Sequence, residues 1–159
     1  RPHDRIILSV TTDSGFEAAK KKLTDVDGLF FFPLDCCVFT WTAIKKINPD
    51  LFVLVETGFW PGFIHLLHLK GVPIILFNGR ISSRSMRKYK MFSSFFSKQF
   101  NRFTMLCIQN PRSMNKLESL GVEKSRLMVV GDPKFDILPN RSQEKREKTC
   151  VLFNRFKFV

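Results

Sequence analysis

Short apolar segments alternate with helical segments along most of the chain. The apolar segments are rich in Ile, Val, Leu and Phe and carry charges only at their ends, which is typical of strands buried on both faces. They predict strands over residues 5–10, 28–34, 51–56, 72–78, 105–109 and 126–131.

The segments between these strands carry the start and stop signals of helices. Pro61 and Pro111 suit a first helical turn, and Gly71 and Gly121 suit the position just beyond a helix end. Together with the helical spacing of apolar residues, these signals predict helices over residues 14–23, 36–47, 61–70, 84–103 and 111–121.

This alternation predicts an α/β fold, namely a Rossmann-like parallel sheet with helices on both faces. The predicted domain covers residues 1–138, followed by a polar linker over 139–149. Residues 150–159, CVLFNRFKFV, resemble the first strand of a second domain. The chain begins with Arg1 rather than Met, so we expect the first domain to be incomplete at its N-terminus.

Charge composition indicates the kind of partner. The chain has 26 Lys and Arg against 14 Asp and Glu, a net charge of +12. Such an excess favours a polyanion, which can be nucleic acid, an anionic membrane or a phosphorylated substrate. The three His and four Cys do not stand at metal-ligand spacing and form no C-x-x-C, so we expect no metal site and a reducing compartment.

Ligands of open α/β sheets bind beyond the carboxyl ends of the strands. The polar residues there are Thr11, Thr12, Asp13, Asp35, Glu56, Thr57, Asn78, Arg80, Gln109, Asn110, Asp132 and Lys134. Glu56 directly follows the apolar run LFVLV. It serves a ligand site, caps the helix after Trp60, or pairs with Arg80, and its position alone does not decide among these roles.

The segment 84–103 combines aromatic and cationic residues and contains no acidic residue. Its aromatic residues recur at helical spacing and predict one face packed on the sheet: Tyr89, Phe92, Phe96, Phe100 and Phe103. A second set would point outward, toward an anionic membrane or phosphate groups: Arg84, Arg87, Lys88, Lys90 and Met91. Aromatic residues on one buried face do not form a stacking platform, so we do not expect nucleic-acid binding.

Four motifs in order resemble one enzyme family. They are VTTDSGFEAA with FPLD, VETGFWP, KGVPIILFNGRISSRSMRKYKMF and VVGDPKFD. The series is similar to the N-terminal domain of the 3-deoxy-D-manno-octulosonic acid (Kdo) transferases, from about residue 5 to about residue 138.

The resemblance implies a GT-B glycosyltransferase with two Rossmann-like domains, of which this chain is the N-terminal half. Such enzymes transfer Kdo from CMP-Kdo to the lipid A precursor with inversion, in lipopolysaccharide biosynthesis. They use no metal or other cofactor and work at the cytoplasmic face of the bacterial inner membrane. The implied partners are therefore CMP-Kdo, the lipid A precursor and an anionic membrane surface contacted through residues 84–103. The alternative is a non-catalytic basic module that binds anionic membranes or a phosphorylated glycolipid.

The resemblance also implies site residues. Glu56 matches the active-site acidic residue of an E-T-E-L-W-P stretch, and Lys134 matches the lysine of a G-N-L-K-F-D stretch facing the same cleft. Arg80, Ser82 and Ser83 match a substrate-binding N-A-R-L-S segment.

The chain departs from the family pattern at several positions. The second Glu of E-T-E is Gly58, and the Asn and Leu of G-N-L-K are Asp132 and Pro133. The family's catalytic base precedes the strand that begins here near Arg5, and the donor-binding second domain is also lacking. We therefore expect this chain to be inactive alone.

Overall fold

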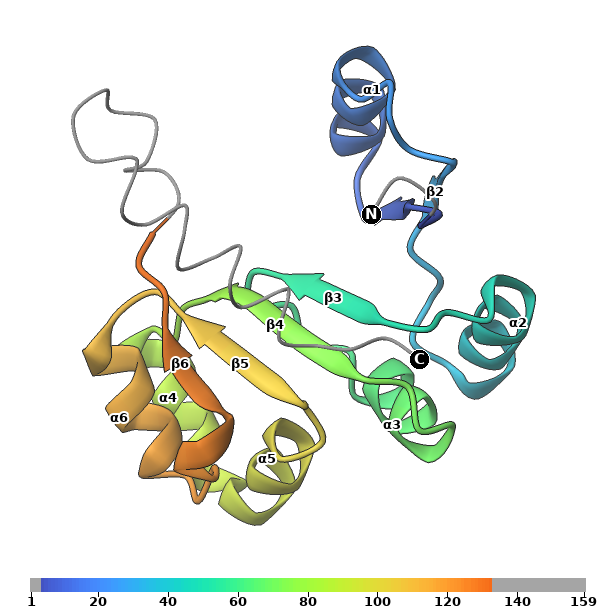
Figure 1. Ribbon diagram of the computed structural model, residues 1–159. Coiled ribbons are helices and arrows are strands. Elements are labelled where there is room, and N and C mark those ends of the chain that lie inside the picture. The colour runs from blue at the N-terminus through green and yellow to red at the C-terminus, as the bar shows by residue number, and fades with distance from the viewer. Residues whose placement is uncertain (1–3, 133–159) are drawn as a thin grey trace, which may run out of the picture.

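A computed structural model describes residues 4–132 and shows six strands and six α-helices there (Figure 1). The strands are β1 (Ile7–Val10), β2 (Gly28–Phe31), β3 (Phe52–Val55), β4 (Ile74–Gly79), β5 (Met105–Ile108) and β6 (Leu127–Val129). The helices are α1 (Asp13–Lys22), α2 (Cys37–Ile47), α3 (Pro61–Leu69), α4 (Ser83–Met91), α5 (Ser93–Phe100) and α6 (Pro111–Glu118), with a 3₁₀ turn over Lys124–Arg126. Every predicted strand is present, so the α/β prediction is confirmed.

The strands are parallel and form two sheets within the described residues. One sheet has four strands in the order β3-β4-β5-β6, and the other pairs β1 with β2. Helices α3 to α6 lie together below the four strands in Figure 1, and α1 lies near β2. A parallel sheet flanked by helices is the Rossmann-like architecture that the sequence predicts.

The core lies between the four-stranded sheet and helices α3 to α6. Leu54, Leu76 and Leu106 lie side by side in the strand register and are buried. Phe63 and Leu67 of α3 join the same cluster from the helical layer. Burial of each such side chain contributes roughly 1.5–3 kcal/mol, so this half of the molecule carries most of the apolar stabilisation.

Strand β4 is irregular near its carboxyl end. Its register with β5 shifts between Leu76 and Gly79, and Asn78 has a left-handed backbone with φ of 60°. A Cβ atom at Gly79 would lie 2.8 Å from both Ile108 Cδ1 and Leu76 Cδ2. Glycine at position 79 therefore lets β4 approach the core side chains of its neighbour.

The predicted long helix over 84–103 is wrong, because the chain breaks at Phe92. That residue adopts φ −122° and ψ 46°, which ends α4 and begins α5. In a straight helix Tyr89 and Phe96 would lie roughly 10 Å apart along the axis. The break instead brings their ring centroids to 4.3 Å, and Phe59 lies 4.9 Å from Phe96.

Phe92 itself turns outward and is 58% exposed, so its predicted place on the buried face is also wrong. Phe100 and Phe103 are buried as predicted, and Tyr89 and Phe96 are partly buried against the core. Burial raises the pKa of the Tyr89 phenol. The aromatic residues thus form a folded cluster rather than a straight stripe.

Candidate functional site

The carboxyl ends of the parallel strands place several polar residues along one edge of the sheet. Glu56 follows β3, Asn78 lies at the end of β4, and Gln109 follows β5. Glu56 and Asn78 both have left-handed backbones, with φ of 64° and 60°. Such conformations are uncommon outside glycine and cluster at functional sites. We call this edge the strand-end rim.

Several polar residues of the rim cap helices. Asp35 accepts hydrogen bonds from the backbone N–H groups of Gly62 (3.0 Å) and Phe63 (2.7 Å), at the start of α3. Thr12 Oγ1 accepts from Gly15 at the start of α1, and Asn110 Oδ1 accepts from a backbone N–H at the start of α6. These three side chains satisfy helix N-termini and are accounted for by the fold.

Glu56 differs from these capping residues. Its backbone N–H donates to the carbonyl of Phe77 at 2.9 Å, which holds its position beside β4. Its side chain is exposed and makes no hydrogen bond or ion pair with residues 4–132. Asp35 caps α3 in its place, and no ion pair joins Glu56 to Arg80 in this part of the chain. Among residues 4–132, Glu56 therefore neither caps the helix after Trp60 nor pairs with Arg80, which favours a ligand-facing role.

Arg80 lies in a loop that is fixed from the side of β3. The Thr57 hydroxyl donates to the carbonyl of Arg80 at 2.7 Å and accepts from its backbone N–H at 2.9 Å. One hydroxyl thus joins the loop after β3, which carries Glu56, to the loop after β4. The Arg80 side chain is exposed, so its guanidinium is available to a ligand while its backbone is held.

The same loop is fixed from the side of α6. The backbone N–H of Ile81 donates to the buried Ser113 hydroxyl at 3.2 Å, and Lys116 Nζ donates to the Ile81 carbonyl at 2.8 Å. Sequence reasoning missed Ser113 and Lys116, because they lie inside a helix and nothing in the sequence indicates what they contact.

Ser82 and Ser83 lie at the start of α4. Ser82 Oγ caps the helix by accepting from the N–H of Ser85 at 3.0 Å, and it lies 2.9 Å from the Ser85 hydroxyl. Ser83 Oγ lies 3.4 Å from Lys116 Nζ and faces α6. Their predicted contact with substrate stays a prediction. Lys134, and with it the linker and second-domain predictions, lie outside the described residues.

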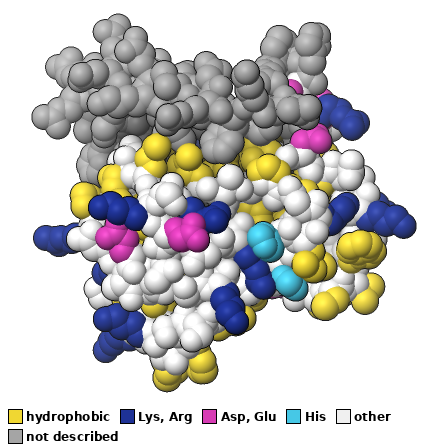
Figure 2. Space-filling model, turned by 60° about the horizontal axis from the view of Figure 1, so that its bottom comes forward, with side chains coloured by type: hydrophobic (Ala, Val, Ile, Leu, Met, Phe, Trp, Pro, Cys, Tyr) yellow, Lys and Arg dark blue, Asp and Glu magenta, His cyan; other side chains and the backbone are white. Residues whose placement is uncertain are grey.

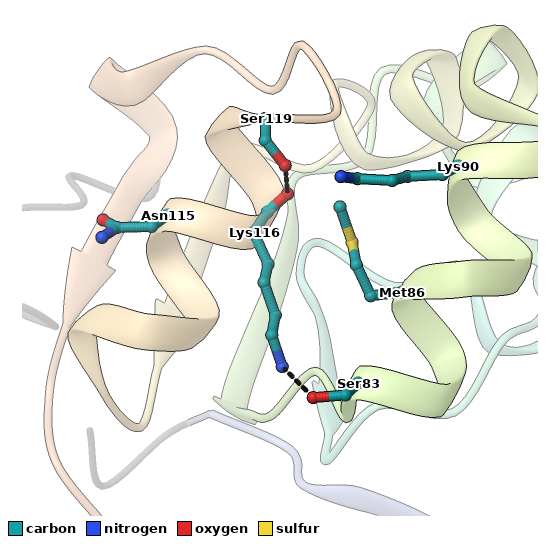
Figure 3. A pocket seen from close by; sticks show the side chains of 6 residues that line it. All are labelled: Ser83, Met86, Lys90, Asn115, Lys116 and Ser119. Carbon is teal, nitrogen blue, oxygen red and sulfur yellow. Dashed lines mark hydrogen bonds between the residues drawn. The ribbon is translucent and has the colours of Figure 1, made fainter.

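An open hollow of about 320 Å³ lies between α4 and α6 (Figure 3). Its lining residues are Ser83, Met86, Lys90, Asn115, Lys116 and Ser119. Lys116 extends across it toward Ser83, and Lys90 approaches along Met86. With two ammonium groups and no carboxylate in its lining, the hollow is suited to an anion.

The junction of α4 and α5 exposes both apolar and cationic side chains. Met91, Phe92 and Phe95 are 71%, 58% and 47% exposed. The predicted outward cations are exposed as well, namely Arg84, Arg87, Lys88 and Lys90. Figure 2 shows Lys and Arg side chains spread over this side of the molecule. Within residues 4–132, no helix has the length and apolar character needed to cross a membrane.

Cysteine and histidine residues form no evident site in the described chain. Cys107 is buried, and burial raises the pKa of its thiol to about 11. Cys107 is therefore a core residue, whereas Cys36 and Cys37 are exposed free thiols. Among residues 4–132, no group of three or more His, Cys, Asp or Glu side chains is arranged to hold a metal.

Comparison with known proteins identifies a family. Residues 1–137 match the family model described as 3-deoxy-D-manno-octulosonic-acid transferase (kdotransferase). A 3-deoxy-D-manno-octulosonic acid transferase of Haemophilus influenzae is 28% identical over 139 residues, which cover 87% of this chain and 33% of the relative.

Two further relatives agree with this match. A bifunctional glycosyltransferase/methyltransferase of Fusobacterium nucleatum is 35% identical over 134 residues, covering 83% of this chain and 21% of that protein. A 3-deoxy-D-manno-octulosonic acid transferase of Rickettsia prowazekii is 28% identical over 153 residues, which cover 94% of this chain and 32% of the relative. The chain therefore spans about a third or less of the length of these relatives.

Proposed function

Because this chain belongs to the 3-deoxy-D-manno-octulosonic-acid transferase family, we propose that it is the N-terminal, acceptor-side half of an inverting GT-B enzyme. The reaction is transfer of Kdo from CMP-Kdo to the lipid A precursor in lipopolysaccharide biosynthesis, without a metal or other cofactor. The site of action is the cytoplasmic face of the bacterial inner membrane. The enzyme is held there peripherally or by an anchor outside this chain.

The observation that carries the proposal is the state of Glu56. Its carboxylate is exposed and has no partner among residues 4–132, while its backbone is fixed beside β4. A carboxylate held at the ligand end of a parallel sheet can accept a proton or a hydrogen bond from a substrate hydroxyl. Glu56 is therefore the proposed catalytic residue on this half of the enzyme.

Cations near Glu56 suit the substrates. Thr57 joins the Glu56 loop to the Arg80 loop, and a guanidinium fork matches phosphate and carboxylate oxygens in pairs. CMP-Kdo carries a phosphate and a carboxylate, and the lipid A precursor carries phosphates. We assign Arg80, Ser82, Ser83 and Lys134 to binding these anions. The Ser82 hydroxyl already caps α4, so Ser82 contributes by holding the start of that helix in place.

A transfer assay tests this function. CMP-Kdo and the lipid A precursor are incubated with this chain and with the longer polypeptide that contains it, and Kdo-bearing lipid is measured by mass spectrometry. We expect product only from the longer polypeptide, since this chain holds one wall of the proposed cleft. A folded longer polypeptide that forms no product with either substrate in excess would refute the assignment.

A second candidate function is a non-catalytic module that binds anionic membranes. The exposed apolar and cationic side chains at the α4–α5 junction favour it. Each cation near an anionic leaflet adds about 1 kcal/mol, and an apolar tip can enter the headgroup region. Binding to anionic vesicles without any transfer activity in the longer polypeptide would favour this function over the enzyme.

A further inference from the structure

The hollow between α4 and α6 has the size and lining of a small-molecule site. Its volume of about 320 Å³ lies at the lower end of the roughly 300–1,000 Å³ of ligand pockets. Met86, which is 7% exposed and belongs to the core cluster, supplies an apolar part of the lining. The other lining residues are polar or charged. An apolar surface with a few hydrogen-bonding groups around it is typical of ligand pockets.

Lys116 presents an ammonium group to the hollow that the fold already holds in place. Its Nζ donates to the Ile81 carbonyl at 2.8 Å and lies 3.4 Å from Ser83 Oγ. Figure 3 shows its side chain crossing from α6 toward the start of α4. An ammonium group has three donors, so at least one remains for a ligand. Because the side chain is already ordered, it loses little conformational entropy when a ligand binds.

Lys90 brings a second ammonium group from the other helix. Its side chain is exposed and makes no hydrogen bond or ion pair with residues 4–132. Figure 3 shows it extending from α4 toward α6. A lysine stem is flexible, so this ammonium can adjust to a ligand that lies beside Lys116. The hollow thus has one fixed and one adjustable positive charge.

No carboxylate within residues 4–132 lines the hollow to compensate these charges. Helix α4 contains no acidic residue, and the first turn of α6 contains none. Glu118 belongs to α6 but not to the lining, and its Oε1 atom is buried. Residues one or two positions apart on a helix do not face each other, so Glu118 lies on a different side of α6 from Lys116 and Ser119. The two positive charges are therefore available to an anion.

The charges and donors of the hollow match one class of anion. A phosphate monoester carries about two negative charges at pH 7 and has three strong acceptor oxygens, whereas a diester carries a single charge. Two ammonium groups balance the charge of the monoester. The Ser83 hydroxyl and the Asn115 amide add uncharged donors for its oxygens. The lining therefore favours a monoester over a diester.

We propose that the hollow between α4 and α6 is a binding site for phosphate monoesters, in which Lys116 and Ser83 hold the phosphate and Lys90 supplies the second charge. Because Lys116 also donates to the Ile81 carbonyl, an occupied site restrains the loop that carries Arg80. The phosphate belongs to a soluble ester or to a lipid headgroup, since both present the same oxygens. The inference rests on the lining and its charges and not on the transferase function.

An NMR titration of the full 159-residue chain tests the site with methyl phosphate, a monoester, and dimethyl phosphate, a diester. Methyl phosphate should cause saturable shifts of the backbone amides of α4 and α6. Because the diester lacks one charge, its Kd should be at least about tenfold higher. The amide of Ile81 should shift together with these helices, since Lys116 joins the hollow to that residue.

Two lysines of α4 provide a matched pair of variants. Lys90→Gln removes a charge from the lining and should raise the Kd for methyl phosphate about tenfold. Lys88→Gln removes the same charge from an exposed residue of the same helix outside the lining, and should change the Kd by less than about twofold. Lys90 is the better test residue than Lys116, because removal of Lys116 also breaks its bond to Ile81.

Vesicles distinguish the two sources of the phosphate. Phosphatidylcholine vesicles contain either phosphatidic acid, whose headgroup is a monoester, or phosphatidylglycerol, a diester, at equal surface charge. Stronger co-sedimentation with phosphatidic acid that is lost in Lys90→Gln and kept in Lys88→Gln assigns the site to a lipid headgroup. Binding of methyl phosphate without this preference assigns it to a soluble ester. Both results support a monoester site.

Four results would overturn the inference. The first is the absence of saturable shifts in α4 and α6 at about 10 mM methyl phosphate, which would exclude a Kd near 1 mM or below. Equal Kd values for the two esters would show that the hollow does not select a double charge. Equal losses in Lys88→Gln and Lys90→Gln would assign binding to the basic surface as a whole. Shifts confined to the residues around Glu56 would place the anion at the strand-end rim instead.

Discussion

Asp35 holds the start of α3 from a loop that is distant in sequence, and its removal has a calculable cost. Its two carboxylate oxygens accept from the N–H groups of Gly62 and Phe63, at 3.0 and 2.7 Å. Replacing a capping carboxylate with alanine costs about 0.5–2 kcal/mol, and bonds to charged groups lie at the upper end of the usual range. We therefore expect Asp35→Ala to lower the free energy of unfolding by about 2 kcal/mol.

Urea unfolding followed by Trp fluorescence measures this change, because Trp60 lies immediately before α3. The midpoint should fall while the slope of the free energy with urea stays constant. Asp35→Asn retains one oxygen in the same place, so this variant should lose about half as much free energy of unfolding as Asp35→Ala. An Asp35→Ala variant within about 0.3 kcal/mol of the parent would refute the capping role.

Gly62 provides an independent check on the same contact. A Cβ at position 62 would lie 2.8 Å from Asp35 Oδ1, so Gly62→Ala should destabilise the chain by displacing the carboxylate. In the Asp35→Ala background that clash is gone, and the same substitution should cost at least about 0.5 kcal/mol less. Equal costs in both backgrounds would mean that the clash does not occur.

The remaining predictions concern the rim, the membrane and the thiols. Glu56→Gln in the longer enzyme should reduce Kdo transfer at least about 100-fold while unfolding energy changes by less than ~1 kcal/mol; full activity would remove Glu56 from the site. Lys134→Ala should raise the KM for a substrate, and unchanged KM and kcat for both substrates would contradict anion binding. Changing Arg84, Arg87, Lys88 and Lys90 together to Gln should release the chain from anionic vesicles in co-sedimentation without unfolding it. A folded variant that still pellets equally would place the docking surface elsewhere. Cys36 and Cys37 should react with a thiol reagent near pH 8, whereas Cys107, whose pKa is about 11, should react only after unfolding.

The sequence predicts the strands and most helices because each is a local pattern. Apolar runs become strands at the expected places, and Pro61 and Pro111 begin α3 and α6. The break at Phe92 is not local in origin. It accompanies aromatic packing that brings Tyr89 and Phe96 together beside Phe59. Phe59 lies in the loop between β3 and α3, far from the break in the sequence.

The candidate site is predictable in position but not in the roles of its residues. Parallel topology places Asp35 and Glu56 in the same group of strand-end residues, and both are carboxylates. Only the fold shows that the Asp35 carboxylate accepts from two N–H groups of α3, while the Glu56 carboxylate has no partner among residues 4–132. Such pairings join residues 27 and 28 positions apart, a distance at which sequence pattern carries no geometric information.

The end of β4 determines where the rim tolerates substitution. Position 79 favours glycine, since a Cβ there would lie 2.8 Å from Ile108 Cδ1 and Leu76 Cδ2 and both side chains would have to shift. Position 78 is buried and left-handed, which restricts it to residues such as Asn, Asp or Gly. Position 80 is exposed, and its hydrogen bonds with residues 4–132 are made by its backbone. A saturation library over 78–80 should therefore retain the widest diversity at position 80, so side chains on this loop can vary there without altering the sheet.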